Sequence, residues 1–534
     1  MKSRARKTVL LIVVTLIVVA SLWLFIEHNR AKWAVTSYKK KLLASGEKLM
    51  VAELLPTPIP KDLDGTVLFR KAIQKFQGRS TALDTNWPNA TRMVAPGKAV
   101  AGWQLPEVVD IDFSSPAKSV TNSWAEIESA LADKREALDA CYALAERPHA
   151  DLRLDYEEGF SLLLPHLAPT KGAAWKLTAA ALSGLRRGDT AGAVTNLHAL
   201  IAVVKATEDE RLVISQLVRI AIANITFTAN WALLQSPAVT DEQLATLQRD
   251  WSELEFNLPT ENALAMERAM SEMVLARMRE SSREFNNVVT GFSGSRGSRS
   301  GGSSSGNFWD NFGPEVDALA NATRMKARET AWRLSWSYVD ELRALKGHQV
   351  LLDSFRRART NDCYHPAILE EKARLTAMGI VPMKSDDSSL LFDPDNDLRE
   401  LFTHSIVSLT KVLNRVMSAE AARQLAISGI ALKRYHLRHG SYPTNLAALV
   451  PEFVETIPRD PVDGQPLRYR ATANDSFVLY SIGEDAKDDG GDPVNPKAGG
   501  PMVWSRGRDW VWPQPASEEE IRAFYEKQFA PAKP

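Results

Sequence analysis

The sequence predicts a mainly α-helical protein with an N-terminal transmembrane helix, an irregular helical bundle or superhelix, and a small α+β domain near the C-terminus. Three observations support this class: an uncharged apolar run over residues 8–26, apolar residues spaced three and four apart across residues 123–398, and short apolar segments of strand type after a final long helix. A chain of 534 residues is too long to fold around one ordinary hydrophobic core, so two or three folding units are expected.

Residues 1–30 are interpreted as a basic N-terminus followed by a single-pass membrane anchor. The run 8–26 is rich in Val, Ile and Leu, and at about 1.5 Å per residue its helix approaches the ~30 Å hydrocarbon core of a bilayer. A cleavable signal peptide is the alternative, but the run is longer than a usual signal core and no small-x-small site precedes Glu27. We therefore expect residues 8–26 to contact the lipid bilayer.

The orientation of this anchor is predicted from chain length rather than from charge. Basic residues lie on both sides of the apolar run, so the positive-inside count does not decide it. A very short basic N-terminus followed by a large domain favours a cytoplasmic N-terminus. The bulk of the chain is then extracytoplasmic, in the periplasm, and held at the cytoplasmic membrane.

Residues 31–122 are predicted to form a juxtamembrane helix to about Met50 and then a loop-rich segment, because Pro56, Pro58 and Pro60 remove donors and fix φ. The mainly helical domain covers residues 123–398 and contains a flexible Gly/Ser/Arg loop at 291–306. Thr240 is a candidate N-cap. The helices expected in this domain cover residues 151–164, 172–187, 190–207, 210–234, 240–251, 262–284 and 314–345.

The C-terminal domain is predicted over residues 399–513, followed by a tail at 514–534. A long helix over residues 397–439 should end at Gly440, which accepts a left-handed backbone conformation. Leu446, Leu449 and Val450 indicate a short second helix, and residues 467–470 and 477–481 indicate short antiparallel strands. These signals alone predict one long helix packed on a small antiparallel sheet.

Four motifs in this region follow one another in an order that is typical of a known head domain. They are His439-Gly440-Ser441-Tyr442-Pro443, Ile457-Pro458-Arg459-Asp460-Pro461, Ser481-Ile482-Gly483-Glu484-Asp485 and Asp509-Trp510-Val511-Trp512-Pro513. The region resembles the globular head of the type II secretion major pseudopilin, the G-type pseudopilin. The apolar run lacks the Gly-Phe leader and the glutamate of a pilin, so assembly into a pilus is not expected.

The resemblance implies a calcium site in an acidic loop. Glu484, Asp485, Asp488, Asp489 and Asp492 repel one another unless they are neutralised, and a hard cation takes carboxylate and backbone oxygens as ligands. The match makes Asp485 the leading ligand, completed by one or more of Asp488, Asp489 and Asp492 and by main-chain oxygens near Ser481. Ala486 stands where the family commonly has glycine, and a solvated acidic loop is the alternative.

No catalytic or other cofactor site is predicted. Residues 302–306 match GxSxG, but they lie in the flexible loop rather than at a strand-to-helix turn. His436 and His439 form an HxxH without a nearby third ligand. Cys141 and Cys363 are interpreted as buried free thiols, with a lone disulfide as the alternative. The chain carries 65 basic and 65 acidic residues, which gives no net field to attract nucleic acid.

The sequence therefore predicts a membrane-anchored, extracytoplasmic, non-enzymatic protein with a pseudopilin-like head. Its expected role is that of an interaction or structural component of the cell envelope or of a type II secretion-like system, with proteins of that system as partners. One alternative is a helical scaffold that binds peptides or proteins in a groove lined by aromatics such as Trp175 and Trp231. Another is an enzyme with an unrecognised site in the helical domain.

Overall fold

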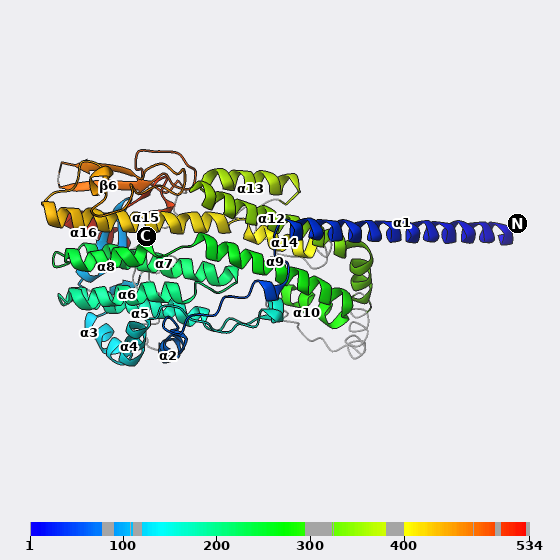
Figure 1. The fold of residues 1–534 in the computed structure, drawn as a ribbon, viewed down its shortest axis with the longest axis horizontal. Helices are drawn as coiled ribbons and strands as arrows, with labels where there is room; N and C mark the ends of the chain where they lie inside the picture. The colour runs from blue at the N-terminus through cyan, green and yellow to red at the C-terminus, as the bar shows by residue number, and fades with distance from the viewer. Residues whose placement is uncertain are drawn as a thin grey trace, which may run out of the picture.

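The computed structural model of this chain is 66% helical, which confirms the mainly α class. Figure 1 shows an elongated body from one end of which a single long helix projects. The structure describes residues 2–76, 90–106, 108–110, 120–293, 323, 325–380, 400–473, 475–496 and 503–529.

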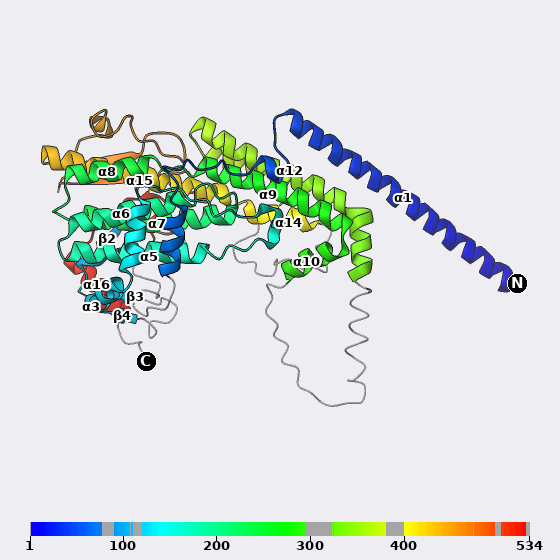
Figure 2. The same ribbon diagram turned by 60° about the horizontal axis from the view of Figure 1, so that its bottom comes forward.

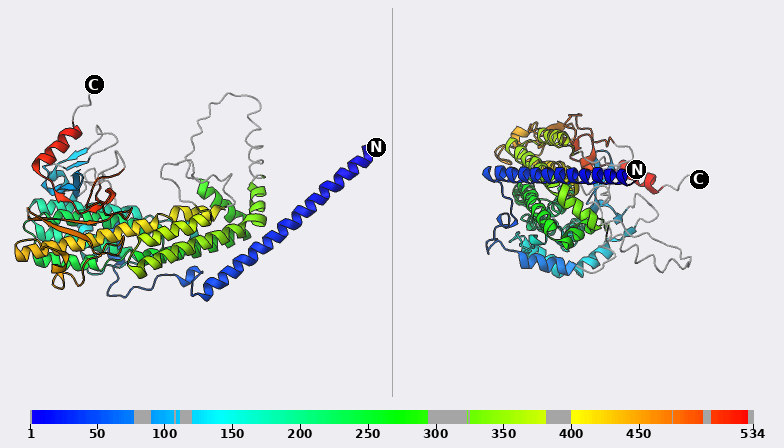
Figure 3. Two further views of the ribbon diagram at one scale, coloured as in Figure 1. Left: turned by 90° about the horizontal axis from the view of Figure 1, so that it is seen from above. Right: turned by 90° about the vertical axis from the view of Figure 1, so that its right-hand side faces the viewer.

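The projecting helix is α1 (Lys2–Ala44), which runs without a break through the predicted anchor and the predicted juxtamembrane helix. Figures 2 and 3 show it diverging from the long axis of the body. Apolar side chains between Leu11 and Ile26 are exposed along it, including Trp23 and Phe25. Val35 and Leu42, in its second half, are buried against the body.

A different helix meets the length and apolarity of a membrane span among the described residues. This is α7 (Val213–Leu234), and 72% of its apolar window is buried inside the body, as expected for a core helix. The anchor at residues 8–26 stays a prediction.

The helical body is built in layers that Figure 1 shows stacked on one another. α2 and α4 contact each other, and α5, α6 and α7 pack in succession above them, with α8 against α6. The layers consist of α2 (Thr66–Phe76), α3 (Trp124–Ala132), α4 (Arg135–Leu144), α5 (Leu167–Arg186), α6 (Thr190–Ala206), α7, and α8 (Asp241–Ser252).

The prediction of a helix over residues 151–164 was wrong. That segment holds only a short 3-10 helix, Tyr156–Ser161, and Gly159 inside it has φ 61°. Arg153 also has a positive φ, of 53°. Both residues have a positive φ, which interrupts an α-helix, and the leucines at 154, 162 and 164 are only partly buried against the body.

The other end of the body adjoins α1. It consists of α9 (Asn257–Glu280), α10 (Ser282–Ser293), a π-helix (Trp332–Trp336), α12 (Ser337–Asn361), α13 (His365–Ala377) and α14 (Leu401–Leu409). The loop predicted at residues 291–306 begins within α10, and from residue 294 onward it lies outside the described residues.

The C-terminal region contains the predicted long helix and small antiparallel sheet. The helix is α15 (Val412–His439), and Gly440 ends it with φ 74°. A 3-10 helix at Leu446–Leu449 follows, and the sheet has the order β5 (Arg468–Thr472), β6 (Ser476–Ser481), β7 (Trp510–Val511). The helix begins later than predicted, because the chain turns between α14 and α15.

α15 lies between the helical body and this sheet, so one core spans both. It contacts α7 and α8 on one side and β6 on the other. A Cβ at Gly429 would lie 2.7 Å from the Trp512 ring, and the Trp512 ring in turn meets Phe227 of α7 at 5.4 Å between centroids. The Trp231 indole donates to the carbonyl oxygen of Pro513 at 2.8 Å. The boundary predicted at 398/399 therefore does not separate two cores.

The segment predicted as a tail joins the N-terminal part of the body. Within it, β8 (Gln514–Pro515) pairs in parallel with β2 (Lys98–Ala101), which is antiparallel to β1 (Thr91–Ala95). α16 (Glu518–Phe529) then packs against β1, as Figure 3 shows. A separate pair, β3 (Val108–Asp110) with β4 (Val120–Asn122), is also antiparallel.

Candidate functional site

The acidic loop of the predicted calcium site gives its carboxylates separate partners. Asp488 accepts from the Tyr480 hydroxyl at 2.9 Å and lies 3.5 Å from Arg468. Asp492 pairs with Arg508 at 3.0 Å. Within the described residues, the Asp485 carboxylate accepts from the backbone amide of Lys487, and the backbone amide of Asp489 donates to the Asp509 carboxylate.

A buried carboxylate organises this loop from within. Asp509 is fully buried and accepts from the backbone amides of Gly491 and Asp492, at 2.7 and 3.0 Å. Burial raises the pKa of Asp509, and these amide donors oppose that shift. Among the described residues, no group of three or more His, Cys, Asp or Glu side chains is suited to hold a metal ion. Asp485, Asp488, Asp489 and Asp492 therefore do not converge, and calcium binding stays a prediction.

The HxxH pair also does not converge. The His436 ring meets the Asp475 carboxylate at 2.7 Å, whereas the His439 ring packs on Tyr435 at 4.2 Å between centroids. The GxSxG match at residues 302–306 lies outside the described residues. Of the two tryptophans suggested for a groove, Trp231 is buried in the core.

One arrangement has the acid–imidazole–hydroxyl order of a nucleophilic triad. The His198 Nδ1 lies 2.5 Å from Asp250, and its Nε2 lies 3.3 Å from the Thr246 hydroxyl. That hydroxyl donates to the Gln243 carbonyl of its own helix at 2.8 Å. Because its proton is committed within the helix, the threonine is not activated in this arrangement.

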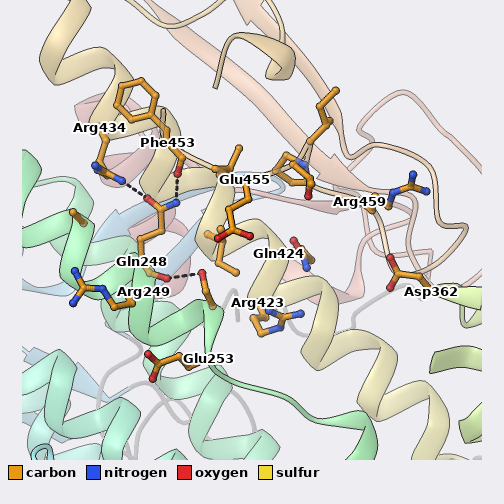
Figure 4. Close-up of a pocket in the computed structure, with 17 residues that line it drawn as sticks. Gln248, Arg249, Glu253, Asp362, Arg423, Gln424, Arg434, Phe453, Glu455 and Arg459 are labelled. Carbon is orange, nitrogen blue, oxygen red and sulfur yellow. Dashed lines mark hydrogen bonds between the residues drawn. The ribbon is translucent and has the colours of Figure 1, made fainter. Parts of the chain in front are cut away.

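A cavity lies where the helical body meets the C-terminal region. It has a volume of about 650 Å³ and lies between α8, α15 and the chain at 453–459 (Figure 4). We call it the α8–α15 cleft. Its lining includes four arginines, three carboxylates and an apolar floor; the charged members are Arg249, Arg423, Arg434, Arg459, Glu253, Asp362 and Glu455.

One face of α8 forms the first wall of this cleft. Ala245, Gln248, Arg249 and Ser252 recur at intervals of three and four, so they share one face of α8. The helix begins at the predicted cap, where the Thr240 hydroxyl accepts from the Gln243 amide at 3.3 Å.

The segment 453–459 forms the opposite wall and is fixed to both helices. The Gln248 amide donates to the Phe453 carbonyl at 2.5 Å, and the Phe453 ring packs beside Tyr435 of α15. The Leu467 amide donates to the Pro458 carbonyl at 2.9 Å, which ties this wall to the start of the sheet. The cleft therefore has a defined shape.

Two of the lining arginines are held by carboxylates. Arg434 donates to Asp241 at 2.7 Å and to Gln248 at 3.0 Å. Arg423 donates through Nε to Glu420 at 2.7 Å. Burial works against the charge of Arg423, but Glu420 outweighs burial and raises the pKa of the guanidinium.

Other polar groups of the cleft have no protein partner within the described part of the chain. These are the Arg249 guanidinium, the two Nη groups of Arg423, the side-chain amide of Gln424, and the carboxylate of Glu455. Arg459 uses one Nη to donate to the Gly464 carbonyl at 2.9 Å. The cleft thus offers several hydrogen-bond donors that solvent or a ligand can satisfy.

Sequence reasoning missed this cleft. Arg423 and Arg434 lie in the predicted long helix and Arg249 in a predicted body helix, but nothing in the sequence brings those helices together. The available signal was confined to α15, where arginines recur on a helix that is otherwise rich in alanine, leucine and isoleucine.

No protein-family model matches the chain, and neither a curated protein nor a solved structure matches it.

Proposed function

We propose that this chain is a membrane-anchored, extracytoplasmic interaction protein without catalytic activity of its own. Residues 8–26 hold it in the cytoplasmic membrane, and the body, with its pseudopilin-like head, meets proteins of the cell envelope or of a type II secretion-like system. The observation that carries the proposal is the division of α1 into an exposed apolar half and a docked half.

The docked half begins where the apolar run ends. The His28 ring makes a 3.0 Å hydrogen bond to the Leu334 carbonyl of the π-helix and meets the Tyr338 ring edge-on at 5.1 Å. Among the residues whose burial is described, the following large apolar side chains before it are exposed: Leu11, Ile12, Val14, Leu16, Val18, Val19, Leu22, Trp23, Phe25 and Ile26. Exposed apolar surface of this extent favours a partner such as the hydrocarbon core of a bilayer.

Buried ion pairs fix the angle between α1 and the body. Lys39 pairs with Glu272 of α9 and Glu341 of α12, whose side chains are 8% and 1% exposed. Arg279 pairs with the same Glu341 and lies 4.0 Å from the Tyr338 ring centroid. Buried pairs demand close geometry, since a charge left without its partner is costly.

A second cluster holds the end of α1. Glu47 accepts from Arg268 at 2.8 Å and also pairs with Arg356 of α12. Burial alone would raise the pKa of Glu47, but hydrogen bonds from Arg356, Arg268 and Gln349 outweigh it and lower the pKa to about 2. The body is therefore fixed to α1 rather than tethered by a flexible linker.

This arrangement suits presentation of a surface at a fixed distance from a membrane. In Figure 1, α1 leaves one end of the body, whereas α8 and the sheet lie toward the other end. The α8–α15 cleft is thus held away from the anchor and open to a partner.

Carbonate extraction of membranes from cells that produce the chain tests the anchor. We expect the native protein to stay in the membrane pellet and the Leu16→Arg/Val19→Arg variant to move to the supernatant, because each central arginine costs about 2.5–3.5 kcal/mol on insertion scales. Trp33→Arg, an exposed substitution on α1 outside the run, should behave as native. Extraction of the native chain, or retention of the double variant, would contradict the proposal.

A further inference from the structure

We infer that the α8–α15 cleft binds an acidic peptide segment of a partner protein. The inference deepens the proposed function and rests on it, since it assigns a ligand class to the surface that the anchored body presents.

Arg423 supplies the first argument. Its side chain is 18% exposed, and its Nε is committed to Glu420 at 2.7 Å. The two Nη groups have no partner among the described residues and line the cleft. A guanidinium presents its free donors as a fork, which a carboxylate accepts through two parallel hydrogen bonds. A partly buried hydrogen-bond donor is stabilised when a ligand supplies an acceptor for it, so Arg423 is the residue that anchors the ligand.

The spacing of the arginines supplies the second argument. Figure 4 shows Arg249 and Arg459 on opposite sides of the view, with Arg423 between them. These guanidinium groups do not converge on one point, so a single phosphate ion would meet one of them at a time. An extended chain with several carboxylates can meet them in turn.

The remaining lining suits a peptide backbone. The floor contains Ile427, Val454 and Pro458, against which apolar side-chain stems can pack. The Gln424 amide has no partner among the described residues, and it can both donate to and accept from a peptide group. A volume of about 650 Å³ lies within the usual range of ligand sites, ~300–1,000 Å³.

Glu455 allows the sign of the charge on the ligand to be tested. Its carboxylate lines the same cleft and has no partner within the described residues. It repels an acidic ligand, so removal of its charge should strengthen binding. A peptide held only by apolar contacts would respond to neither Glu455 nor Arg249.

The test uses the full chain in detergent micelles and a fluorescein-labelled hexaglutamate peptide, followed by fluorescence anisotropy at low salt. We expect saturable binding that Arg249→Gln weakens about fivefold and Glu455→Gln strengthens by a similar factor. Arg423→Lys should also weaken binding, since lysine keeps the charge and loses the fork. Arg147→Gln, an exposed arginine on the loop after α4, is the matched control and should bind as native.

Arg249 is exposed and without a partner in the described structure, so its variant should fold even if Arg423→Lys does not. Failure of hexaglutamate to bind would overturn the inference, as would weaker binding in Glu455→Gln or equal loss in Arg147→Gln. Full displacement of the peptide by low-millimolar inorganic phosphate would overturn the peptide assignment in favour of a small-anion site. Carbonate extraction reads the anchor independently, so a failed peptide test leaves the proposed function standing.

Discussion

Replacing Trp512 by alanine tests whether the C-terminal sheet and the helical body share one core. Trp512 is 4% exposed and lies between Gly429 of α15 and Phe227 of α7. An aromatic side chain of this kind buries about 150–250 Å², worth about 4–6 kcal/mol at ~25 cal/mol per Å² as an upper bound. Measured truncations of Trp cost about 3–5 kcal/mol, and we expect a loss of unfolding free energy in that range.

The location of the loss distinguishes a shared core from two separate ones. Hydrogen–deuterium exchange of the full chain in micelles is read separately in peptides from α7 and from β6. We expect faster exchange in both segments of Trp512→Ala, because the indole supports both. Trp33→Ala, on the exposed side of α1, should change neither. Faster exchange confined to β6, with α7 unchanged, would refute the reasoning.

Three further perturbations follow from the buried charges and the acidic loop. Lys39→Met removes one ion-pair partner from the buried Glu272 and Glu341, so the free energy of unfolding in thermal denaturation should fall by about 3–5 kcal/mol. Lys40→Met, at the exposed neighbouring position, should leave the free energy of unfolding unchanged. Glu371 is 3% exposed, and burial raises its pKa from 4.5 to about 8. A carboxyl whose folded pKa is raised stabilises the fold at low pH and loses that contribution as pH rises from 4.5 to 8. The free energy of unfolding of Glu371→Met should therefore exceed that of the native chain by about 3 kcal/mol at pH 7. This difference should disappear near pH 4, as measured by urea titration. The calcium prediction requires that Ca²⁺ raise the melting temperature of the native chain but not of Asp485→Asn; an equal response in both, or none in the native chain, would count against it.

The sequence predicted those elements whose signals are local. Thr240 starts α8 by accepting from an otherwise unpaired first-turn amide, and Gly440 ends α15 with a left-handed residue, as expected from cap chemistry. The prediction of a helix over residues 151–164 failed because residues of positive φ interrupt the segment. The spacing of apolar residues alone carries no information about backbone dihedral angles.

The packing between distant segments could not be predicted in the same way. β2 pairs in parallel with β8, so that Lys98 lies opposite Gln514. This pairing could not be predicted, because the sequence of a short strand does not specify which strand it pairs with. The α8–α15 cleft likewise depends on the contact of α15 with α8, which places Arg423 opposite Arg249. Side chains from four separate segments line this cavity, namely α8, Asp362, α15 and residues 453–459, and only the assembled fold brings them together.

Site-specific photo-crosslinking in the intact membrane tests the central proposal, that the anchored body meets a partner through this cleft. A photoreactive phenylalanine analogue is placed at Glu455 on the cleft and, as control, at the exposed Glu146 on the loop after α4. We expect one discrete protein adduct from position 455 that Arg249→Gln diminishes, and none from position 146. No adduct at position 455, or the same adducts from both positions, would contradict the account.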